Sequence, residues 1–129
     1  MSTPSTSHGT HDYVDDPRNA DVLIYVNGEL VPRSQAFVSV FDAGFTMGDG
    51  VWEGIRLHRG RLLFLESHLD RLFAGAGAIG LTGLDRGVLE AALHATLAAH
   101  PTPHGAHVLL LVPRGLNAPP PPEPRPPLG

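Results

Sequence analysis

The chain has 129 residues, of which 42% are hydrophobic and 17% are charged, a composition that allows one folded domain with a moderate core. Its formal net charge of −4 argues against a nucleic-acid-binding protein, and its lack of cysteine excludes disulfides and cysteine-ligated metal sites. All nine basic residues are arginines, so chemistry that needs a lysine amine has no candidate in this sequence.

Both ends of the chain differ in composition from its middle. Residues 1–20 are polar, rich in Ser, Thr, His, Asp and Pro, and we expect them to be disordered. Residues 116–129 are mainly proline and favour polyproline II. No apolar run approaches the ~20 residues of a membrane span, and the first residues do not resemble a signal peptide. We therefore expect a folded domain over residues 21–115, no membrane partner and a cytoplasmic location.

A β-hairpin is predicted at the start of this domain. Residues 22–26 form a β-rich run, Asn27-Gly28 is a strong hairpin turn, and residues 29–31 begin the return strand. The apolar residues 36–41 are predicted to form another short strand or a connector.

A second hairpin follows. Residues 51–58 alternate partly and predict a strand, in which Trp52 and Glu53 point to opposite faces. The Arg59-Gly60 turn then leads into a return strand over residues 61–64.

Beyond this hairpin the period changes to that of a helix. Apolar residues recur at three- and four-residue steps over residues 65–79, although glycines, Gly75 among them, are expected to fray the end of this helix. Asp85 is the predicted N-cap of a second helix, which His100 closes. Residues 106–112 predict a strongly apolar, interior strand.

Two motifs about twenty residues apart carry a family resemblance. The first is GFTMGDGVWEGIR at residues 44–56, and the second is HLDRL at residues 68–72. In this order they resemble the N-terminal small domain of the class IV (fold type IV) aminotransferases, branched-chain and D-amino-acid aminotransferases among them, which use pyridoxal phosphate. The resemblance implies an α+β (α/β) fold of the D-amino-acid aminotransferase-like type, with two helices packed on an antiparallel sheet. It also implies a homodimer or a larger assembly.

The resemblance assigns Arg71, the arginine of the second motif, to the cofactor phosphate. A planar guanidinium suits this role because it offers paired donors to a phosphate dianion. The alternative is a helix-surface ion pair with Asp70 or Glu66. No metal site is predicted, because three histidines with metal-like spacing lack a carboxylate partner: His100, His104 and His107.

Three further residues resemble positions that border the substrate pocket in the family: Trp52, Phe45 and Arg114. Core packing is the alternative for the two aromatic residues, and surface exposure is the alternative for Arg114. Glu53 is expected to pair with Arg56 or Arg114 and is assigned no catalytic role.

In the complete enzymes of this family, a larger C-terminal domain supplies the lysine that forms a Schiff base with the cofactor aldehyde. We therefore assign no catalytic residue here, and we expect the chain alone to be inactive and to lack firm cofactor binding. The complete enzyme would exchange an amino group between an amino acid, branched-chain or related, and a 2-oxo acid. The first hypothesis is thus the N-terminal part of such an enzyme, without its large domain. The alternative is a non-catalytic interaction module, or pseudoenzyme, that pairs with a full-length relative and offers its proline-rich tail as a ligand.

Overall fold

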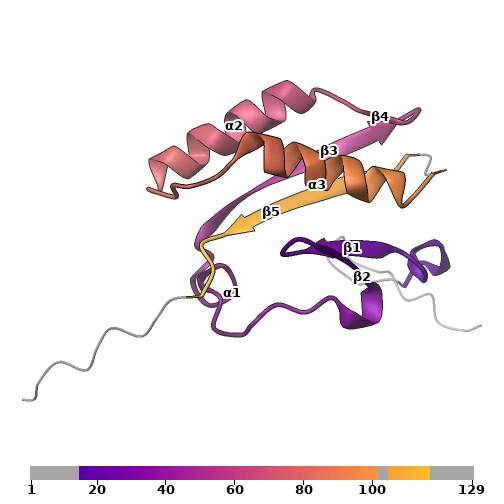
Figure 1. Ribbon diagram of the computed structural model, residues 1–129, viewed down its shortest axis with the longest axis horizontal. Coiled ribbons are helices and arrows are strands. Elements are labelled where there is room, and N and C mark those ends of the chain that lie inside the picture. The colour runs from indigo at the N-terminus through magenta and orange to yellow at the C-terminus, as the bar shows by residue number, and fades with distance from the viewer. Residues whose placement is uncertain (1–14, 102–104, 117–129) are drawn as a thin grey trace, which may run out of the picture.

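The computed structural model describes residues 15–101 and 105–116, which contain two antiparallel sheets and two long helices (Figure 1). The predicted segments at residues 1–14 and 117–129, together with His104, lie outside the described residues. The two long helices are α2, Leu65–Ala78, and α3, Arg86–Ala98. None of the helices in the described ranges is both long and apolar enough to cross a membrane.

The predicted first hairpin is confirmed as β1, Leu23–Val26, paired with β2, Glu29–Pro32. Asn27 and Gly28 at its tip have φ angles of 47° and 97°, which suits the two-residue turns whose twist matches that of the strands. The hairpin forms its own two-stranded sheet and contacts α3 (Figure 1). Short 3-10 turns flank it, at Pro17–Asn19 and Arg33–Gln35.

The larger sheet has the strand order β4-β3-β5. Its strands are β3, Gly50–His58, β4, Arg61–Leu62, and β5, His107–Pro113. The pairing of β3 with β5 runs from Gly50 opposite Pro113 to Arg56 opposite His107. A Cβ on Gly50 would come within 2.8 Å of the Pro113 backbone, so only glycine allows the strands to approach this closely. Residues 36–41 are a connector rather than a strand.

The core lies between this sheet and the two long helices. Its buried centre is made of Ile55 from β3, Leu69 and Leu72 from α2, and Leu93 from α3. Gly75 lies inside α2, and a Cβ placed there would be 3.4 Å from Val51 of β3. The prediction that Gly75 frays the helix was therefore wrong, because α2 continues through this residue to Ala78.

The other face of the sheet is exposed in the described chain. Along β5 partly buried and exposed side chains alternate, and Leu109 and Leu111 are 58% and 62% exposed. Trp52, opposite Leu111 on β3, is 66% exposed. The prediction of an interior β5 was wrong, since β5 is an edge strand of this sheet and only one of its faces meets the helices.

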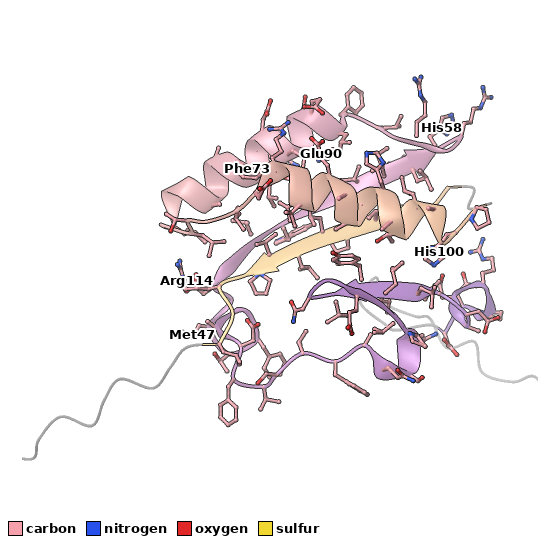
Figure 2. The ribbon with its side chains drawn as sticks, in the orientation of Figure 1. Met47, His58, Phe73, Glu90, His100 and Arg114 are labelled. Carbon is pink, nitrogen blue, oxygen red and sulfur yellow. The ribbon has the colours of Figure 1, made fainter. Side chains whose placement is uncertain are left out.

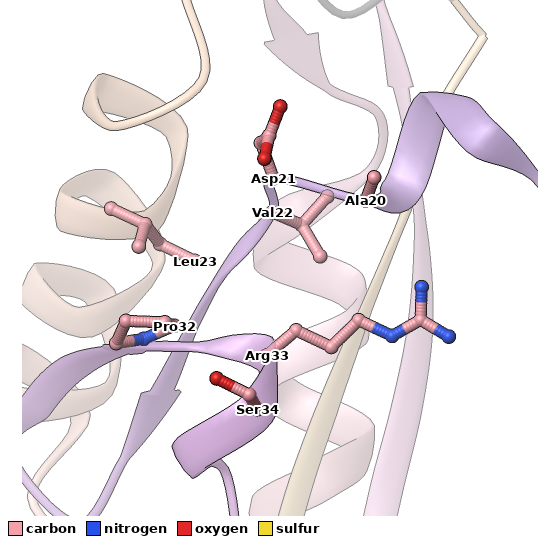
Figure 3. A pocket seen from close by; sticks show the side chains of 7 residues that line it. All are labelled: Ala20, Asp21, Val22, Leu23, Pro32, Arg33 and Ser34. Atoms are coloured by element: carbon pink, nitrogen blue, oxygen red, sulfur yellow. The ribbon is translucent and has the colours of Figure 1, made fainter.

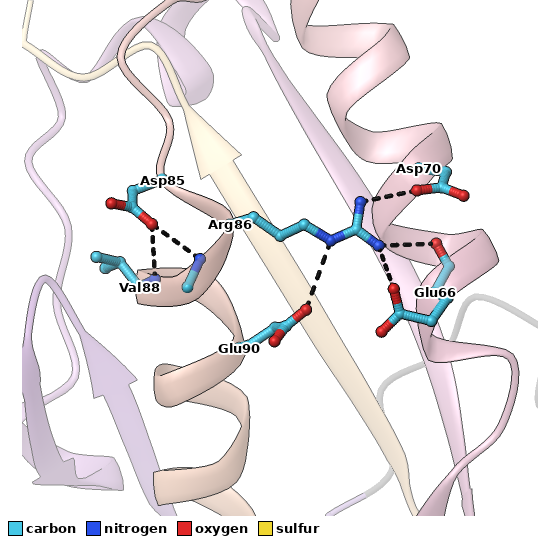
Figure 4. A network of polar contacts seen from close by, with 7 residues as sticks. Glu66, Asp70, Asp85, Arg86, Val88 and Glu90 are labelled. Atoms are coloured by element: carbon cyan, nitrogen blue, oxygen red, sulfur yellow. Dashed lines mark hydrogen bonds and ion pairs between the residues drawn. The ribbon is translucent and has the colours of Figure 1, made fainter.

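Polar contacts fix α3 against α2. As predicted, Asp85 caps α3 by accepting hydrogen bonds from the Gly87 and Val88 amides. Arg86 then reaches across to α2 (Figure 4), where its Nη1 donates to Asp70 Oδ1 at 2.7 Å and its Nη2 to Glu66 Oε2 at 2.6 Å. The two acidic residues that were the alternative partners of Arg71, Asp70 and Glu66, are thus held by Arg86.

Candidate functional site

The arginine of the HLDRL motif forms a two-pronged ion pair with a buried carboxylate. Arg71 Nε donates to Glu53 Oε1 and Arg71 Nη2 donates to Glu53 Oε2, both at 2.6 Å. The ring Nδ1 of His68, one helical turn before Arg71, lies 2.7 Å from the same Oε2. Glu53 belongs to β3 and both partners belong to α2, so the contact joins the strand to the helix that covers it.

Burial and charge make this contact strong. The Glu53 side chain is 4% exposed, and it occupies a position on the inner face of β3 between Val51 and Ile55. A carboxylate there is costly unless it is paired and hydrogen-bonded. The hydrogen bonds from Arg71, opposed by burial and assisted by His68, lower the pKa of Glu53 from 4.5 to about 2. Glu53 is therefore ionised at neutral pH, and its charge is balanced by Arg71.

Arg71 itself remains open to solvent. Its side chain is 72% exposed, and the ion pair uses only the Nε–Nη2 edge of the guanidinium. Nη1 has no hydrogen-bond partner among the described residues, and the side chain that carries it is mostly exposed. The alternative pairing with Asp70 or Glu66 was wrong, as was the expected pairing of Glu53 with Arg56 or Arg114.

Arg114 has a different set of partners. Its Nε donates to Asp49 Oδ2 at 2.6 Å and its Nη2 donates to the Ile79 carbonyl oxygen at 2.6 Å. These contacts join the end of β5 to the start of β3 and the end of α2. Arg114 lies at the same end of the sheet as α1, Ala43–Met47, a short helix capped by Asp42 (Figure 2).

Neither predicted pocket aromatic is packed in the core. Phe45 of α1 is 68% exposed and Trp52 of β3 is mostly exposed, so the core alternative was wrong for both in the described chain. Trp52 lies on the open face of the sheet, whereas Arg71 pairs with Glu53 on the helix-covered side. The structure thus places the predicted residues around the first half of β3 without bringing Arg71 and Trp52 to one face.

A hollow elsewhere in the domain contains no predicted site residue. This hollow, between the first 3-10 turn and the hairpin, is lined by residues 20–23 and 32–34 (Figure 3). Among the described residues, no group of three or more His, Asp or Glu side chains is arranged to hold a metal. His100 instead joins α3 to the hairpin, with Nδ1 2.7 Å from the Thr96 carbonyl oxygen and Nε2 accepting from the Leu23 amide at 3.0 Å.

The role of Glu53 and His68 as partners of Arg71 was missed from the sequence. One signal was present: Glu53 interrupts the inner-face series of Val51, Ile55 and Leu57 with a charge. A buried charge in an otherwise apolar series demands a partner of opposite sign. The helical spacing of His68 and Arg71, three residues apart on one side of α2, would then have named the candidates.

No family model matches the chain, but individual proteins are similar to it. The chain is 40% identical over 100 residues to the branched-chain-amino-acid aminotransferase-like protein 1 of Arabidopsis thaliana, an alignment that covers 77% of this chain and 18% of the relative. It is 38% identical over 97 residues to a D-alanine aminotransferase of Listeria innocua, covering 74% of this chain and 33% of the relative. The chain thus spans at most about a third of the length of these relatives.

A solved structure agrees with these matches. A hypothetical aminotransferase from Mycobacterium tuberculosis, in its PLP-bound form, has a TM-score of 0.66 at 24% identity, covering 73% of this chain and 34% of that one. The form of that protein bound to alpha-ketoglutarate and PMP has a TM-score of 0.64 at 26% identity, with the same coverage. The fold expected from the two motifs is confirmed.

Proposed function

This chain is homologous to the N-terminal part of the class IV aminotransferases, and from that premise we propose that its domain forms the phosphate-holding side of a pyridoxal phosphate site. The observation that carries the proposal is the state of Arg71. One edge of its guanidinium is fixed by a buried carboxylate, and its side chain is still mostly exposed. A guanidinium fixed in this way suits a phosphate, which accepts several hydrogen bonds and carries up to two negative charges.

The fit is good for one end of the cofactor only. Pyridoxal phosphate, when bound, supplies an aldehyde and an electron-withdrawing ring that make amino-group exchange possible. Arg71 would hold the phosphate end by charge and by hydrogen bonds from Nη1. The aldehyde end needs an amine, and the 129 residues contain no lysine. The proposal therefore assigns this chain a role in binding and orientation, and assigns the reactive amine to a larger lysine-bearing domain.

The proposed reaction of the complete protein is the transfer of an amino group between an amino acid and a 2-oxo acid. Branched-chain or related amino acids are the proposed class of amino-acid substrate. The name of one relative supports this class, and the name of another points to D-alanine. The alpha-ketoglutarate in the Mycobacterium tuberculosis structure supports a 2-oxo acid as the partner substrate. A homodimer in the cytoplasm is the proposed assembly and location.

Trp52, Phe45 and Arg114 are proposed to border the substrate pocket of the complete protein. The exposure of Trp52 and Phe45 supports this, since a pocket wall must be free to meet substrate or another domain. Arg114 would border the pocket from the end of β5, where Asp49 holds its guanidinium. The domain proposed to carry all of these residues spans residues 21–115.

Binding of a phosphorylated and an unphosphorylated ligand tests the phosphate role. Pyridoxine 5′-phosphate and pyridoxine are suitable because neither has an aldehyde that would react with the N-terminal amine. We expect the phosphate ester to shift the side-chain NMR signals of Arg71 and pyridoxine to leave them unchanged. Arg71→Leu should abolish binding, and Arg56→Leu, which removes an exposed arginine from the open face of the sheet, should not. Equal binding by Arg71→Leu and the unchanged chain would refute the proposal.

A further inference from the structure

The buried carboxylate of Glu53 would not itself contact a phosphate held by Arg71. Glu53 does not face solvent, and its two oxygens are occupied by Arg71 and His68. It is an unusual residue for its position, because its neighbours on the inner face of β3 are apolar and pack against the helices. An apolar side chain would fill this position without the cost of burying a charge.

We infer that Glu53 is a positioning residue, which holds the Arg71 guanidinium in the single orientation that presents Nη1 to a phosphate. This inference rests on the proposed phosphate role of Arg71. It extends that role to a residue that would not itself touch the ligand, and to His68, whose Nδ1 lies 2.7 Å from the carboxylate Oε2.

Geometry supports positioning. An arginine side chain that is mostly exposed samples many rotamers and loses this freedom when it binds a ligand. Two parallel hydrogen bonds of 2.6 Å to a carboxylate anchored in the core remove much of that freedom beforehand. Such preorganisation improves affinity by lowering the entropy lost on binding.

Electrostatics alone predicts the opposite effect of Glu53 on an anion. Its negative charge lies directly behind the guanidinium and partly cancels the attraction of Arg71 for phosphate. If Glu53 had no positioning role, removing its charge would tighten phosphate binding. If Glu53 positions Arg71, removing the charge loosens the guanidinium and weakens binding. The sign of the change therefore separates the two roles.

The experiment is an NMR titration of the 129-residue chain with inorganic phosphate, followed at the Nε–H signal of Arg71. Glu53→Gln keeps the size of the side chain and removes its charge. Asp70→Asn is the matched control, because it removes an exposed negative charge next to Arg71 in the sequence without touching the Glu53 contact. Phosphate should bind Glu53→Gln roughly fivefold to tenfold more weakly than the unchanged chain, from the lost ordering of one arginine side chain. Asp70→Asn should bind as well as the unchanged chain or slightly better.

Rotation of the guanidinium gives a second readout that needs no ligand and no variant. In the unchanged chain, the Arg71 Nη signals should show slow rotation about the Nε–Cζ bond, unlike those of an unpaired surface arginine. Fast rotation would overturn the inference even if Glu53→Gln failed to fold. Equal or tighter phosphate binding by a folded Glu53→Gln would also overturn it while leaving the proposed function intact. Phosphate that leaves the Arg71 signals of the unchanged chain unaffected would overturn both.

Discussion

The ion pair between Glu53 and Arg71 should make the stability of the domain depend on acid. The pKa of Glu53 lies well below its ordinary value because Arg71 donates two hydrogen bonds to the ionised form. A group whose pKa is lowered by folding contributes stability that is fully present above its unfolded pKa of 4.5. That stability is lost as the pH falls through the folded value of about 2.

The size of the effect follows from the shift. One pKa unit corresponds to about 1.4 kcal/mol, so a change from 4.5 to about 2 corresponds to about 3 kcal/mol of unfolding free energy. This value is an upper limit, because Glu53 is almost fully shielded from water whereas its partner Arg71 is mostly exposed and screened by solvent. A loss of this size is large beside the ~5–15 kcal/mol that stabilises an ordinary domain.

Urea unfolding between pH 7 and pH 2, followed by the circular dichroism of α2 and α3, measures this loss. Urea is preferable to guanidinium chloride, whose ionic strength would screen the pair. Glu53→Gln is the reference, because it cannot titrate at this position. The unfolding free energy of the unchanged chain should exceed that of Glu53→Gln at pH 7, and the difference should shrink by up to about 3 kcal/mol by pH 2. A difference that stays constant over this range would refute the ion pair.

Three other outcomes are expected. Leu72→Ala, which truncates a side chain that is 1% exposed in the core, should lower the free energy of urea unfolding by about 2–5 kcal/mol. His100→Ala should speed hydrogen exchange at the Leu23 amide, which loses its acceptor, and unchanged exchange there would contradict the contact. Leu111→Ser on the open sheet face should reduce self-association in sedimentation experiments and change the free energy of unfolding by no more than about 0.5 kcal/mol. Unaltered association would show that this face does not mediate self-association.

Features that depend on neighbouring residues in the sequence were predictable. The Asn27-Gly28 turn needs positive φ angles that these two residues tolerate, and the Asp85 cap needs only the amides that follow it. The short helix α1 was missed because five residues show no helical period. Its local signals were nevertheless present, with Asp42 as the N-cap and Gly48 in the left-handed conformation at its end.

Features that depend on which faces of the strands and helices pack together were harder to predict from the sequence. The partner of Glu53 is 18 residues away and became its neighbour only because α2 packs on the inner face of β3. The apolar residues of β5 indicated a strand, but not that one of its faces stays open in the described chain. Arg71 was singled out through its motif, and the carboxylate that holds it was visible only as a charge in an apolar series.

The measurement that tests the central claim most directly uses a chimera. Residues 21–115 replace the matching stretch of the Listeria innocua D-alanine aminotransferase, whose remaining length supplies the rest of the protein. Pyridoxal phosphate retained after gel filtration is then measured by absorbance, for the chimera and for its Arg71→Leu variant. Our account predicts that the chimera retains the cofactor and that Arg71→Leu, still folded, loses most of it. Equal retention by both folded proteins would show that Arg71 does not hold the phosphate, and would contradict the account.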